Sequence, residues 1–341
     1  MKHAQRIRRV GIISAAAVAT LSLALAGCSS SGGGTAPSSN PKGATIGALY
    51  LDAQGFYGGI KKGIEDGAKA DSIKLIGQNS AGDATKEAQF MSTLTSGGVK
   101  AIIMSPVSDT ASVPVVRQAH DAGIPVICYN TCITDSAAKG LVYALVTTDQ
   151  KKLGHDVGIE AGNYFKAKGN TAPRIAILNC DVYQACVERK AGFKSAVESV
   201  LPHVQWAADQ AGFEPDKATS TATTILTGDP KVDAFFATTD NGTIGAVQGV
   251  LATNRTGKTV VFGNDISLQL AKYFVSNPNI LIATNGQDAQ AMGRGAVQQA
   301  LNAIKGMKVK HYLTTIPTTL FKASDTAQIN QWITTHADGI P

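Results

Sequence analysis

The sequence predicts an α/β fold with two similar lobes, each a doubly wound parallel β-sheet covered by helices on both faces. Short, mostly apolar runs of strand length alternate with longer segments of helical spacing, which is typical of sheets buried on both faces. The alternation runs through the first half of the chain and then starts again in the second half. Two successive β-α-β series indicate two sheets, and roughly 300 folded residues suffice for two medium-sized domains.

The first series begins where the apolar run 45–51 follows a stretch of small and polar residues. Its strands contain few charged residues, as expected for strands without a solvent-facing side. Segments with apolar residues at helical spacing separate the first four strands. We predict strands at 45–51, 74–78, 101–105, 125–130 and 142–147, and helices at 57–70, 83–96 and 113–122.

The second series repeats this pattern from residue 174 onward. Its strand-like runs are again short and apolar, and helix-like segments alternate with most of them. We predict strands at 174–179, 204–208, 234–238, 259–263 and 280–283, and helices at 188–200, 241–252, 267–277 and 287–305.

Residues 1–27 have the character of a secretion signal. Four basic residues and no acidic one precede an uncharged apolar run that ends in Leu-Ala-Gly before Cys28. This ending resembles the lipobox of bacterial lipoproteins, which implies cleavage before Cys28, acylation of its thiol and an extracytoplasmic protein anchored to the cell membrane. The charge pattern disfavours a buried N-terminal helix of a cytosolic protein. A transmembrane anchor is disfavoured because 10–26 is shorter than the roughly 20 residues that span a bilayer.

The segment 28–43 is predicted to be a flexible tether. Ser, Gly, Thr, Ala and Pro make up almost all of it, and this composition cannot bury a core. The folded part then begins near Ala44. Removing the four cations of the signal from the net charge of +6 leaves +2 for the mature chain. No Lys/Arg cluster remains that would indicate binding to nucleic acid.

Ligands of open parallel sheets bind outside the carboxyl ends of the strands, so the residues after each predicted strand are candidate site residues. They include carboxylates, amides, hydroxyls, aromatic rings and one Arg. This set suits a polyhydroxylated ligand, because planar polar groups bind neighbouring hydroxyls in pairs and aromatic faces pack on C–H surfaces. The segments are 52–57, 129–131, 179–189, 238–240 and 263–265.

The same segments do not predict a phosphate-binding cofactor site. No predicted strand is followed by a Gly-rich loop that opens a helix. Residues 252–259 match a relaxed phosphate-loop pattern, but a predicted helix precedes them and a predicted strand follows, which reverses the order that the motif requires. We therefore expect no nucleotide and no other cofactor.

Taken together, the order and spacing of several segments resemble the ribose-binding-protein-like group of periplasmic binding proteins, the substrate-binding lipoproteins of ABC importers. The resemblance covers residues 44–320. It implies the type I periplasmic binding protein fold and a non-enzymatic role. The segments that carry it are 55–57, 123–127, 148–149 before a helix with Gly154, 188–193, 237–240, 263–265 and 282–287.

The resemblance also implies how the lobes are divided. The chain would cross between them three times, near 147–149, 284–287 and 316–318, and these crossings would form a hinge. The N-terminal lobe would then contain 44–148 plus 287–316, and the C-terminal lobe 149–286 plus 317–341.

By position, the resemblance assigns roles to individual residues. Phe56 and Tyr57 would stack on the sugar faces, and Arg189 would bind ring or hydroxyl oxygens. Asp265 would accept hydrogen bonds from hydroxyls, and Gln287 would supply an amide at a hinge crossing. The remaining predicted ligand-binding residues are Gln54, Asn130, Thr131, Thr239, Asp240 and Asn264.

Some of these positions depart from the pattern of the ribose binder. Gln54 and Thr239 stand where that protein has Asn, and Asn264 replaces an aromatic residue before the Asp. Asn130 and Thr131 replace an Asp-Arg pair. The loss of one Arg and one Asp argues against ribose itself.

Several candidates also have an ordinary structural alternative. Arg189 could pair with Glu188 on a helix surface. Asp240 and Asp265 could cap the helices that follow them. The aromatic pair could pack in the core at the start of its helix.

Four cysteines follow Cys28 in what would be an exported domain, and four allow three pairings. Cys128 and Cys132 follow a strand of the first lobe, whereas Cys180 and Cys186 follow a strand of the second. Pairing between the lobes would staple a cleft that must open, which leaves local pairs or free thiols; we expect local pairs. Four thiols on two moving lobes make a poor zinc site, so we expect no metal.

The function that these observations favour is a solute receptor that captures a sugar or sugar alcohol and delivers it to an ABC permease and its ATPase. We expect it to be a monomer. The alternatives are a chemosensory receptor of the same fold and an importer component for an autoinducer, nucleoside or amino acid. An anchored hydrolase is disfavoured because no Ser or Cys has a recognisable His partner. The signal and the lack of an N-terminal helix-turn-helix segment exclude a DNA-binding repressor.

Overall fold

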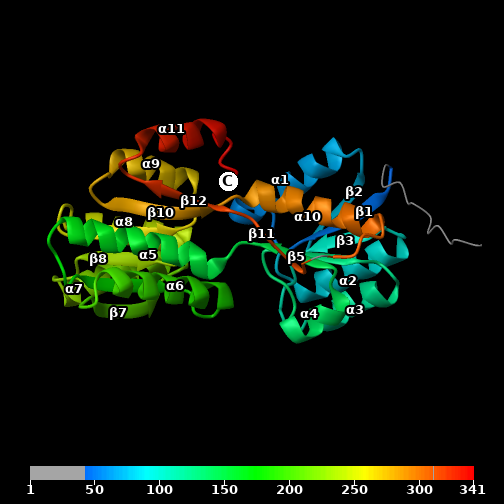
Figure 1. Cartoon of the computed structure of the whole chain (residues 1–341), viewed down its shortest axis with the longest axis horizontal. Helices are drawn as coiled ribbons and strands as arrows, with labels where there is room; N and C mark the ends of the chain where they lie inside the picture. The colour runs from blue at the N-terminus through cyan, green and yellow to red at the C-terminus, as the bar shows by residue number, and fades with distance from the viewer. Residues whose placement is uncertain (1–42, 310) are drawn as a thin grey trace, which may run out of the picture. The chain divides into compact units, whose positions relative to one another are not determined.

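Strands and helices alternate along nearly all of the chain that the computed structural model describes, residues 43–309 and 311–341. They build two six-stranded sheets (Figure 1). The predicted signal, nearly all of the tether and Cys28 lie outside the described residues. Within the described ranges, no helix combines the length and the apolarity that crossing a membrane requires.

The first sheet has the strand order β11-β5-β4-β3-β1-β2, and all its neighbouring strands run parallel. Successive side chains of β1 point to opposite faces of the sheet. Ala48 packs in the core beneath α1 and α10, whereas Leu49 packs in the core beneath α2, α3 and α4. The strands are β1 Thr45–Tyr50, β2 Lys74–Asn79, β3 Ala101–Met104, β4 Val126–Tyr129, β5 Ala144–Thr147 and β11 Leu313–Thr315; the helices are α1 Gly55–Ala70, α2 Ala84–Ser96, α3 Val113–Asp121, α4 Asp135–Leu141 and α10 Ala289–Ile304.

The second sheet has the order β12-β10-β9-β8-β6-β7. Helices α5 and α6 cover one face, and α7, α8, α9 and α11 cover the other. The strands are β6 Arg174–Asn179, β7 Gln205–Ala211, β8 Ala234–Ala237, β9 Val260–Asn264, β10 Leu281–Gln287 and β12 Thr318–Lys322; the helices are α5 Gln150–Ala167, α6 Gln184–Val200, α7 Pro215–Gly228, α8 Asp240–Ala252, α9 Leu268–Ser276 and α11 Thr326–Thr335.

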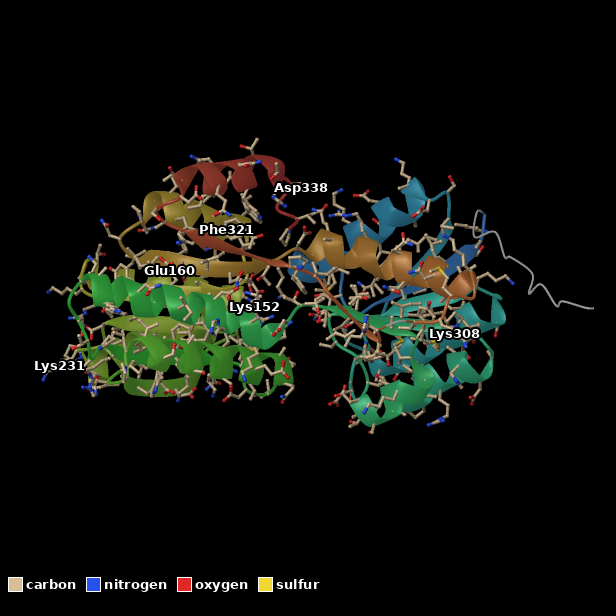
Figure 2. All side chains as sticks on the ribbon, viewed as in Figure 1. Lys152, Glu160, Lys231, Lys308, Phe321 and Asp338 are labelled. Carbon is tan, nitrogen blue, oxygen red and sulfur yellow. A yellow bond between two sulfur atoms is a disulfide. The ribbon has the colours of Figure 1, made fainter. Side chains whose placement is uncertain are left out.

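One pair in the second sheet is antiparallel, unlike the wholly parallel sheet that the sequence predicts. Strand β12 pairs with β10 in the opposite direction. The reason is its connection: β12 begins three residues after β11 ends at the carboxyl edge of the first sheet. It therefore enters the second sheet from the edge where β10 finishes. Phe321, labelled in Figure 2, anchors it in the core. Its ring lies edge-on to that of Trp332, with 6.3 Å between the ring centroids.

The chain passes from one sheet to the other three times, at 148–149, at 288 and at 316–317. The crossings at 148–149 and 316–317 fall within the expected segments, whereas the one at 288 comes just after the expected segment 284–287, which belongs to β10. Each of them follows directly on the carboxyl end of a strand, β5, β10 or β11. The residues beside the crossings are therefore also beside the carboxyl edges, where a ligand would bind.

Glycines allow the paired helices of each lobe to approach closely. A Cβ atom at Gly154 of α5 would lie 1.9 Å from the backbone oxygen of Arg189 on α6, and one at Gly192 would lie 2.0 Å from that of Lys151. In the other lobe, a Cβ at Gly63 of α1 would lie 2.1 Å from the oxygen of Gln290 on α10. Because backbone cannot yield as a flexible side chain can, the contacts of Gly154 and Gly192 fix the position of α6, which carries Arg189, against α5.

Candidate functional site

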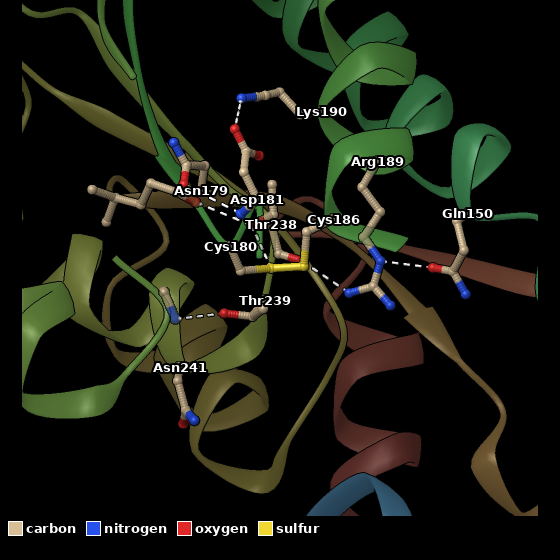
Figure 3. Close-up of a disulfide and its surroundings, with 12 residues drawn as sticks. Gln150, Asn179, Cys180, Asp181, Cys186, Arg189, Lys190, Thr238, Thr239 and Asn241 are labelled. Atoms are coloured by element: carbon tan, nitrogen blue, oxygen red, sulfur yellow. Dashed lines mark hydrogen bonds and ion pairs between the residues drawn. A yellow bond between two sulfur atoms is a disulfide. The ribbon is translucent and has the colours of Figure 1, made fainter. Parts of the chain in front are cut away.

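Four polar side chains form a closed ring of hydrogen bonds at the carboxyl edge of the second sheet. Arg189 donates from Nε to Oε1 of Gln150 at 2.7 Å (Figure 3) and from Nη1 to Oδ2 of Asp265 at 2.9 Å. Gln287 donates from Nε2 to Oδ1 of Asp265 at 2.7 Å and accepts at Oε1 from Nε2 of Gln150 at 3.3 Å. The ring joins α5, α6, the end of β10 and the loop after β9.

Arg189 is a buried cation whose direction is fixed. Only 6% of the residue is exposed, and Nη1 also donates to the backbone oxygen of Thr238 at 2.9 Å. Glu188 does not pair with it and instead accepts from Nε2 of Gln184 at 3.3 Å. Within the part of the chain that the structure describes, the Nη2 atom of Arg189 makes no hydrogen bond. It is thus a charged donor available to a ligand.

Gln150 is a member of the ring that the sequence does not single out. It is the first residue of α5, directly after the crossing at 148–149, and its side chain is buried. The only signal in the sequence is its place beside an expected crossing. Its contact with Gln287 depends on two segments more than a hundred residues apart, which no local pattern reveals.

Asp265 has a left-handed backbone with φ of +66°. Its backbone oxygen accepts from Oγ1 of Thr284 at 2.5 Å, and its carboxylate belongs to the ring. It does not cap α9, because Ser267 accepts at Oγ from the backbone nitrogen of Leu270 at 3.4 Å. The side chain is therefore not used to stabilise the helix and remains oriented toward Arg189.

Asp240 begins α8 but is not its N-cap. Thr239 is the cap and accepts at Oγ1 from the backbone nitrogen of Gly242 at 3.1 Å. Burial raises the pKa of Asp240 to about 6, and the nearby Asp265 carboxylate adds to the shift, while Arg189 opposes it. Two carboxylates and one guanidinium therefore share this edge of the second lobe.

On the first lobe, Asn130 and Tyr57 form a second polar group. Asn130 has φ of +59° and donates from Nδ2 to the phenol oxygen of Tyr57 at 2.9 Å. Burial raises the pKa of Tyr57, and the hydrogen bond from Asn130 lowers it. The hydroxyl of Thr131 lies 2.9 Å from that of Ser105. Thus Asn130 and Thr131, which replace the charged pair of the ribose binder, make uncharged contacts.

The aromatic pair starts α1 and is half-buried. The ring of Phe56 meets that of Tyr57 edge-on at 5.7 Å, and Tyr57 meets Tyr129 at 6.5 Å. Tyr57 therefore packs partly as a core residue. Gln54 precedes them at the N-cap position of α1, where its side chain is exposed and accepts no capping hydrogen bond.

A hollow of about 60 Å³ lies between the two lobes. From the first lobe, Gly55 and Phe56 line it; from the second, Asp240, Asp265 and Gln287 do. The remaining lining residues are Ile266, Ser267, Gly339 and Pro341. The structure thus brings an aromatic ring of one lobe and two carboxylates of the other to the same space.

The other predicted ligand residues do not line this hollow. Arg189 donates a hydrogen bond to Asp265, which lines the hollow, but Arg189 itself does not line it. Tyr57 and Asn130 contact each other on the first lobe, across from Arg189. Asn264 is fully buried, and neither polar atom of its side chain has a partner among the described residues. The other members outside the lining are Gln54, Thr131 and Thr239.

Both disulfides hold loops of the candidate site. The Cys128–Cys132 bond encloses Asn130 and Thr131, with the two Cα atoms 5.4 Å apart. The Cys180–Cys186 bond closes the loop between β6 and α6, one turn before Arg189, with Cα atoms 5.5 Å apart (Figure 3). Neither bond joins the two lobes. Among the described residues, no group of three or more His, Cys, Asp or Glu side chains is arranged to hold a metal ion.

Two aromatic residues at the carboxyl edge of the second sheet were assigned no role from the sequence, although one of them lies within the candidate segment 179–189. Tyr183 lies in the disulfide loop, and Phe213 follows β7; their rings meet edge-on at 5.9 Å. Phe213 was missed because β7 was expected to end at 208 and in fact continues to Ala211. Its last residues are exposed and include the polar Asp209 and Gln210, so the run lacks the apolar character of the inner strands.

Comparisons with known proteins agree with the two-lobed α/β fold. The model of the periplasmic binding protein domain matches residues 48–308. The ABC transporter periplasmic-binding protein YphF of Escherichia coli (strain K12) is 37% identical over 299 residues, which cover 87% of this chain and 90% of that protein. The ribose import binding protein RbsB of Bacillus subtilis (strain 168) is 28% identical over 279 residues, covering 80% and 86% respectively.

A solved structure shares the fold. An ABC transporter periplasmic solute binding protein from Actinobacillus succinogenes 130z with bound D-allose superimposes with a TM-score of 0.75. The match covers 84% of this chain and 100% of that chain at 24% sequence identity. At this identity the likeness concerns the arrangement of strands and helices.

Proposed function

Because the chain belongs to the periplasmic binding protein family, we propose that it captures a neutral monosaccharide or sugar alcohol between its two lobes. Family membership makes it the solute-binding component of an ABC importer and not an enzyme. The observation that carries the choice of ligand is the hydrogen-bonded ring of Arg189, Gln150, Gln287 and Asp265 at the edge of the interlobe hollow.

The charges of this ring favour a neutral ligand. Arg189 and Asp265 are already paired at 2.9 Å, so neither needs an opposite charge from the ligand. Their free donor and acceptor positions suit hydroxyl groups, which can donate and accept at once. Phe56 adds an apolar face to the same hollow, and C–H surfaces of a sugar can pack there.

The relatives support the class of ligand but not its identity. The name of the Bacillus subtilis relative assigns it to ribose import. Asn130 and Thr131 stand where the sugar-binding pattern has a charged pair, and here they contact Tyr57 and Ser105 instead. We therefore infer a ligand with a different arrangement of hydroxyls from that of ribose.

Capture would work by closure of the lobes. Gln150 and Gln287 lie beside two of the three crossings, so the ring that binds the ligand is connected to the segments that bend. A ligand that contacts Phe56 on one lobe and Asp265 on the other binds the closed form more tightly than the open one. Its binding therefore shifts the population toward closure, and the closed form would be recognised by the permease.

The proposal extends to the cellular setting. We infer that the protein acts outside the cytoplasm, tethered through lipid on Cys28, and delivers its ligand as a monomer to a permease with its ATPase. The signal sequence and the periplasmic names of the relatives support this location. The sequence places the lobes at 44–148 plus 287–316 and at 149–286 plus 317–341; because Gln287 is the last residue of β10 in the second sheet, we place the second boundary just after it.

A thermal-shift screen tests the ligand class directly. A ligand present at about 1,000 times its Kd adds roughly 4 kcal/mol to the free energy of unfolding, which gives a clear rise in Tm. We expect hits among monosaccharides, cyclitols or linear polyols. A panel that contains nucleosides and amino acids serves as the comparison. Stabilisation by those compounds without any by sugars or polyols would show that the proposed ligand class is wrong.

A further inference from the structure

Residues 337–341, here called the tail, lead from α11 of the second lobe to α1 of the first. A Cβ atom at Gly59 of α1 would lie 2.0 Å from the backbone oxygen of Pro341, so the tail touches the backbone of this helix. Gly59 lies within one turn of Phe56 on α1. The tail is thus a contact between the lobes in addition to the three crossings, and it lies beside the proposed ligand site.

Hydrogen bonds and a ring stack hold the tail in a defined conformation. The ring of His336 stacks on that of Trp332 of α11, with 4.2 Å between the ring centroids. Gly339 has φ of +76°, a conformation that favours glycine, and its backbone nitrogen donates to the oxygen of His336 at 2.9 Å. The nitrogen of Ile340 donates to Oδ1 of Asp338 at 3.1 Å. These contacts fix the turn by which the chain leaves α11.

Pro341 lies between two hollows. It lines the interlobe hollow of about 60 Å³, and it also lines a second hollow of about 250 Å³ beside α11, here called the α11 hollow. Ile266 and Gln287 line both hollows as well, so the two adjoin. Ile266 is buried and Gln287 is held in the hydrogen-bonded ring. The tail is therefore the part of the shared wall that the core does not fix.

The side chains around the α11 hollow suit a sugar ring. Amides and hydroxyls offer donors and acceptors to its hydroxyls, and aromatic rings offer a surface for its C–H groups. Among the described residues, the ionisable side chains of this lining are His336 and Asp288. Asp288 already caps α10, where it accepts from the backbone nitrogen of Ala291 at 2.7 Å. The polar and aromatic lining residues are Thr319, Phe321, Gln328, Gln331, Trp332 and Thr335.

We propose that the tail is a specificity-determining segment that closes the ligand site on the side of α11 and restricts the ligand to a single sugar or polyol unit. This inference rests on the proposed function. With the tail removed, the interlobe hollow would open into the α11 hollow, and a second ring joined to the ligand would find space beside Trp332. With the tail in place, Pro341 blocks that path, and a longer ligand must break the contact with Gly59 to enter.

The test uses calorimetry to compare single-unit probes with probes that carry one more ring. D-ribose, D-allose and D-galactose are used free and as their phenyl glycosides, myo-inositol is paired with galactinol, and sorbitol with maltitol. In the wild type we expect the extended probe to bind about 100-fold more weakly than its parent. Deletion of 339–341 should lower this ratio of Kd values about tenfold or more for the parent that binds best. Pro341→Gly removes only the side chain from the shared wall and should lower the ratio in the same direction.

Two further variants serve as controls. Ile340→Ala changes a tail residue that lines neither hollow and should keep the Kd values of the wild type. Gln331 lines the α11 hollow alone, so Gln331→Trp, added to the deletion, should fill that space. It should abolish the gain for the extended probe, while the parent binds as it does to the deletion variant.

Three results would overturn this inference alone. The first is a Kd ratio that neither the deletion nor Pro341→Gly changes. The second is a wild type that binds extended probes as tightly as their parents. The third is a gain that Gln331→Trp leaves intact, because the second ring then lies elsewhere. Failure of the wild type to bind any sugar or polyol overturns the proposed function as well.

Discussion

Asn130 and Asp265 occupy equivalent positions in the two lobes and share the same unusual backbone conformation. Each follows the fourth strand of its series, and their φ angles are +59° and +66°. In each lobe the backbone oxygen accepts from a threonine hydroxyl of the next strand: Thr147 for Asn130 at 2.7 Å, and Thr284 for Asp265 at 2.5 Å. The two lobes thus repeat one local arrangement.

This repeated arrangement directs a polar side chain into the interlobe region from each side. A left-handed backbone is costly for most residues other than Gly, and Asn and Asp tolerate it best. Such conformations persist where the surrounding structure enforces them, often at ligand sites. Asn130 reaches Tyr57, and Asp265 reaches Arg189, so both lobes present an ordered polar group before ligand binds.

Arg189→Ala should weaken ligand binding by two or more orders of magnitude, about 3 kcal/mol. The substitution removes the charged donor and leaves Gln150 and Asp265 without their partner. Calorimetry with the ligand from the screen measures the effect. Glu188→Ala is the matched control, because Glu188 contacts Gln184 and not the ring. Near-native affinity of Arg189→Ala would exclude the ring as the ligand site.

The strands of this fold could be predicted because most of them are buried on both faces. Runs such as 101–104 consist of apolar residues alone. The antiparallel β12 could not be predicted, since its direction follows from the third crossing and not from its own residues. Helix α7 was missed because its many Thr residues are β-branched and do not favour helices; its buried Ala218, Ala222 and Leu226 stabilise it by packing.

The candidate site was predictable only in part. Arg189 and Asp265 follow strand ends, so the general rule for parallel sheets locates them. Gln150 joins them through contacts between segments that the crossings bring together. Asn264, which precedes Asp265, was predicted as a ligand residue, yet its side chain is fully buried beneath the edge. A sequence position beside the site does not specify which way a side chain points.

Stability should fall as pH rises through the titration of Asp240. Its pKa is raised to about 6 in the folded protein from 3.8, so the folded state binds this proton more tightly than the unfolded state does. The resulting stabilisation is present below about pH 4 and is lost by about pH 6 to 7. It amounts to at most on the order of 3 kcal/mol.

Asp240→Asn tests this linkage. The neutral amide should be more stable than the wild type at pH 7.5 and should show a smaller change of stability between pH 4 and pH 7.5. Urea unfolding at several pH values measures both. The same pH dependence in variant and wild type would mean that Asp240 is not the titrating group.

Removing the Cys128–Cys132 bond should affect binding more clearly than folding. The loop it closes is short, so the entropic stabilisation is roughly 2 kcal/mol, but the loop contains Asn130 and Thr131. We expect the double substitution of both cysteines by Ala to weaken ligand binding about tenfold.

Peptide mapping of the wild type should find the disulfides Cys128–Cys132 and Cys180–Cys186. A bond between the two pairs would contradict closure of the lobes.

Cys28→Ser should release the protein from the membrane or leave an unprocessed precursor, because a single thiol would carry the lipid. Cell fractionation and the mass of the mature chain measure the outcome. Ser30→Ala, a change in the same segment that keeps the thiol, is the control and should remain membrane-bound. A Cys28→Ser protein with unchanged fractionation and mass would rule out the lipid anchor.

Gly154→Ala should destabilise the protein and weaken ligand binding together. A Cβ atom there would lie 1.9 Å from the backbone oxygen of Arg189, so α5 and α6 must move apart and Arg189 with them. Overpacking of this kind costs about 1 to 3 kcal/mol of unfolding free energy.

Gly140→Ala is the matched control. Gly140 also lies in a helix, α4, but a Cβ atom there would have no other atom within 4 Å. Ala at this position should be neutral or slightly stabilising. Urea unfolding and calorimetry on both variants measure the two effects. A Gly154→Ala protein that unfolds and binds like Gly140→Ala would show that the close contact of these helices does not position Arg189.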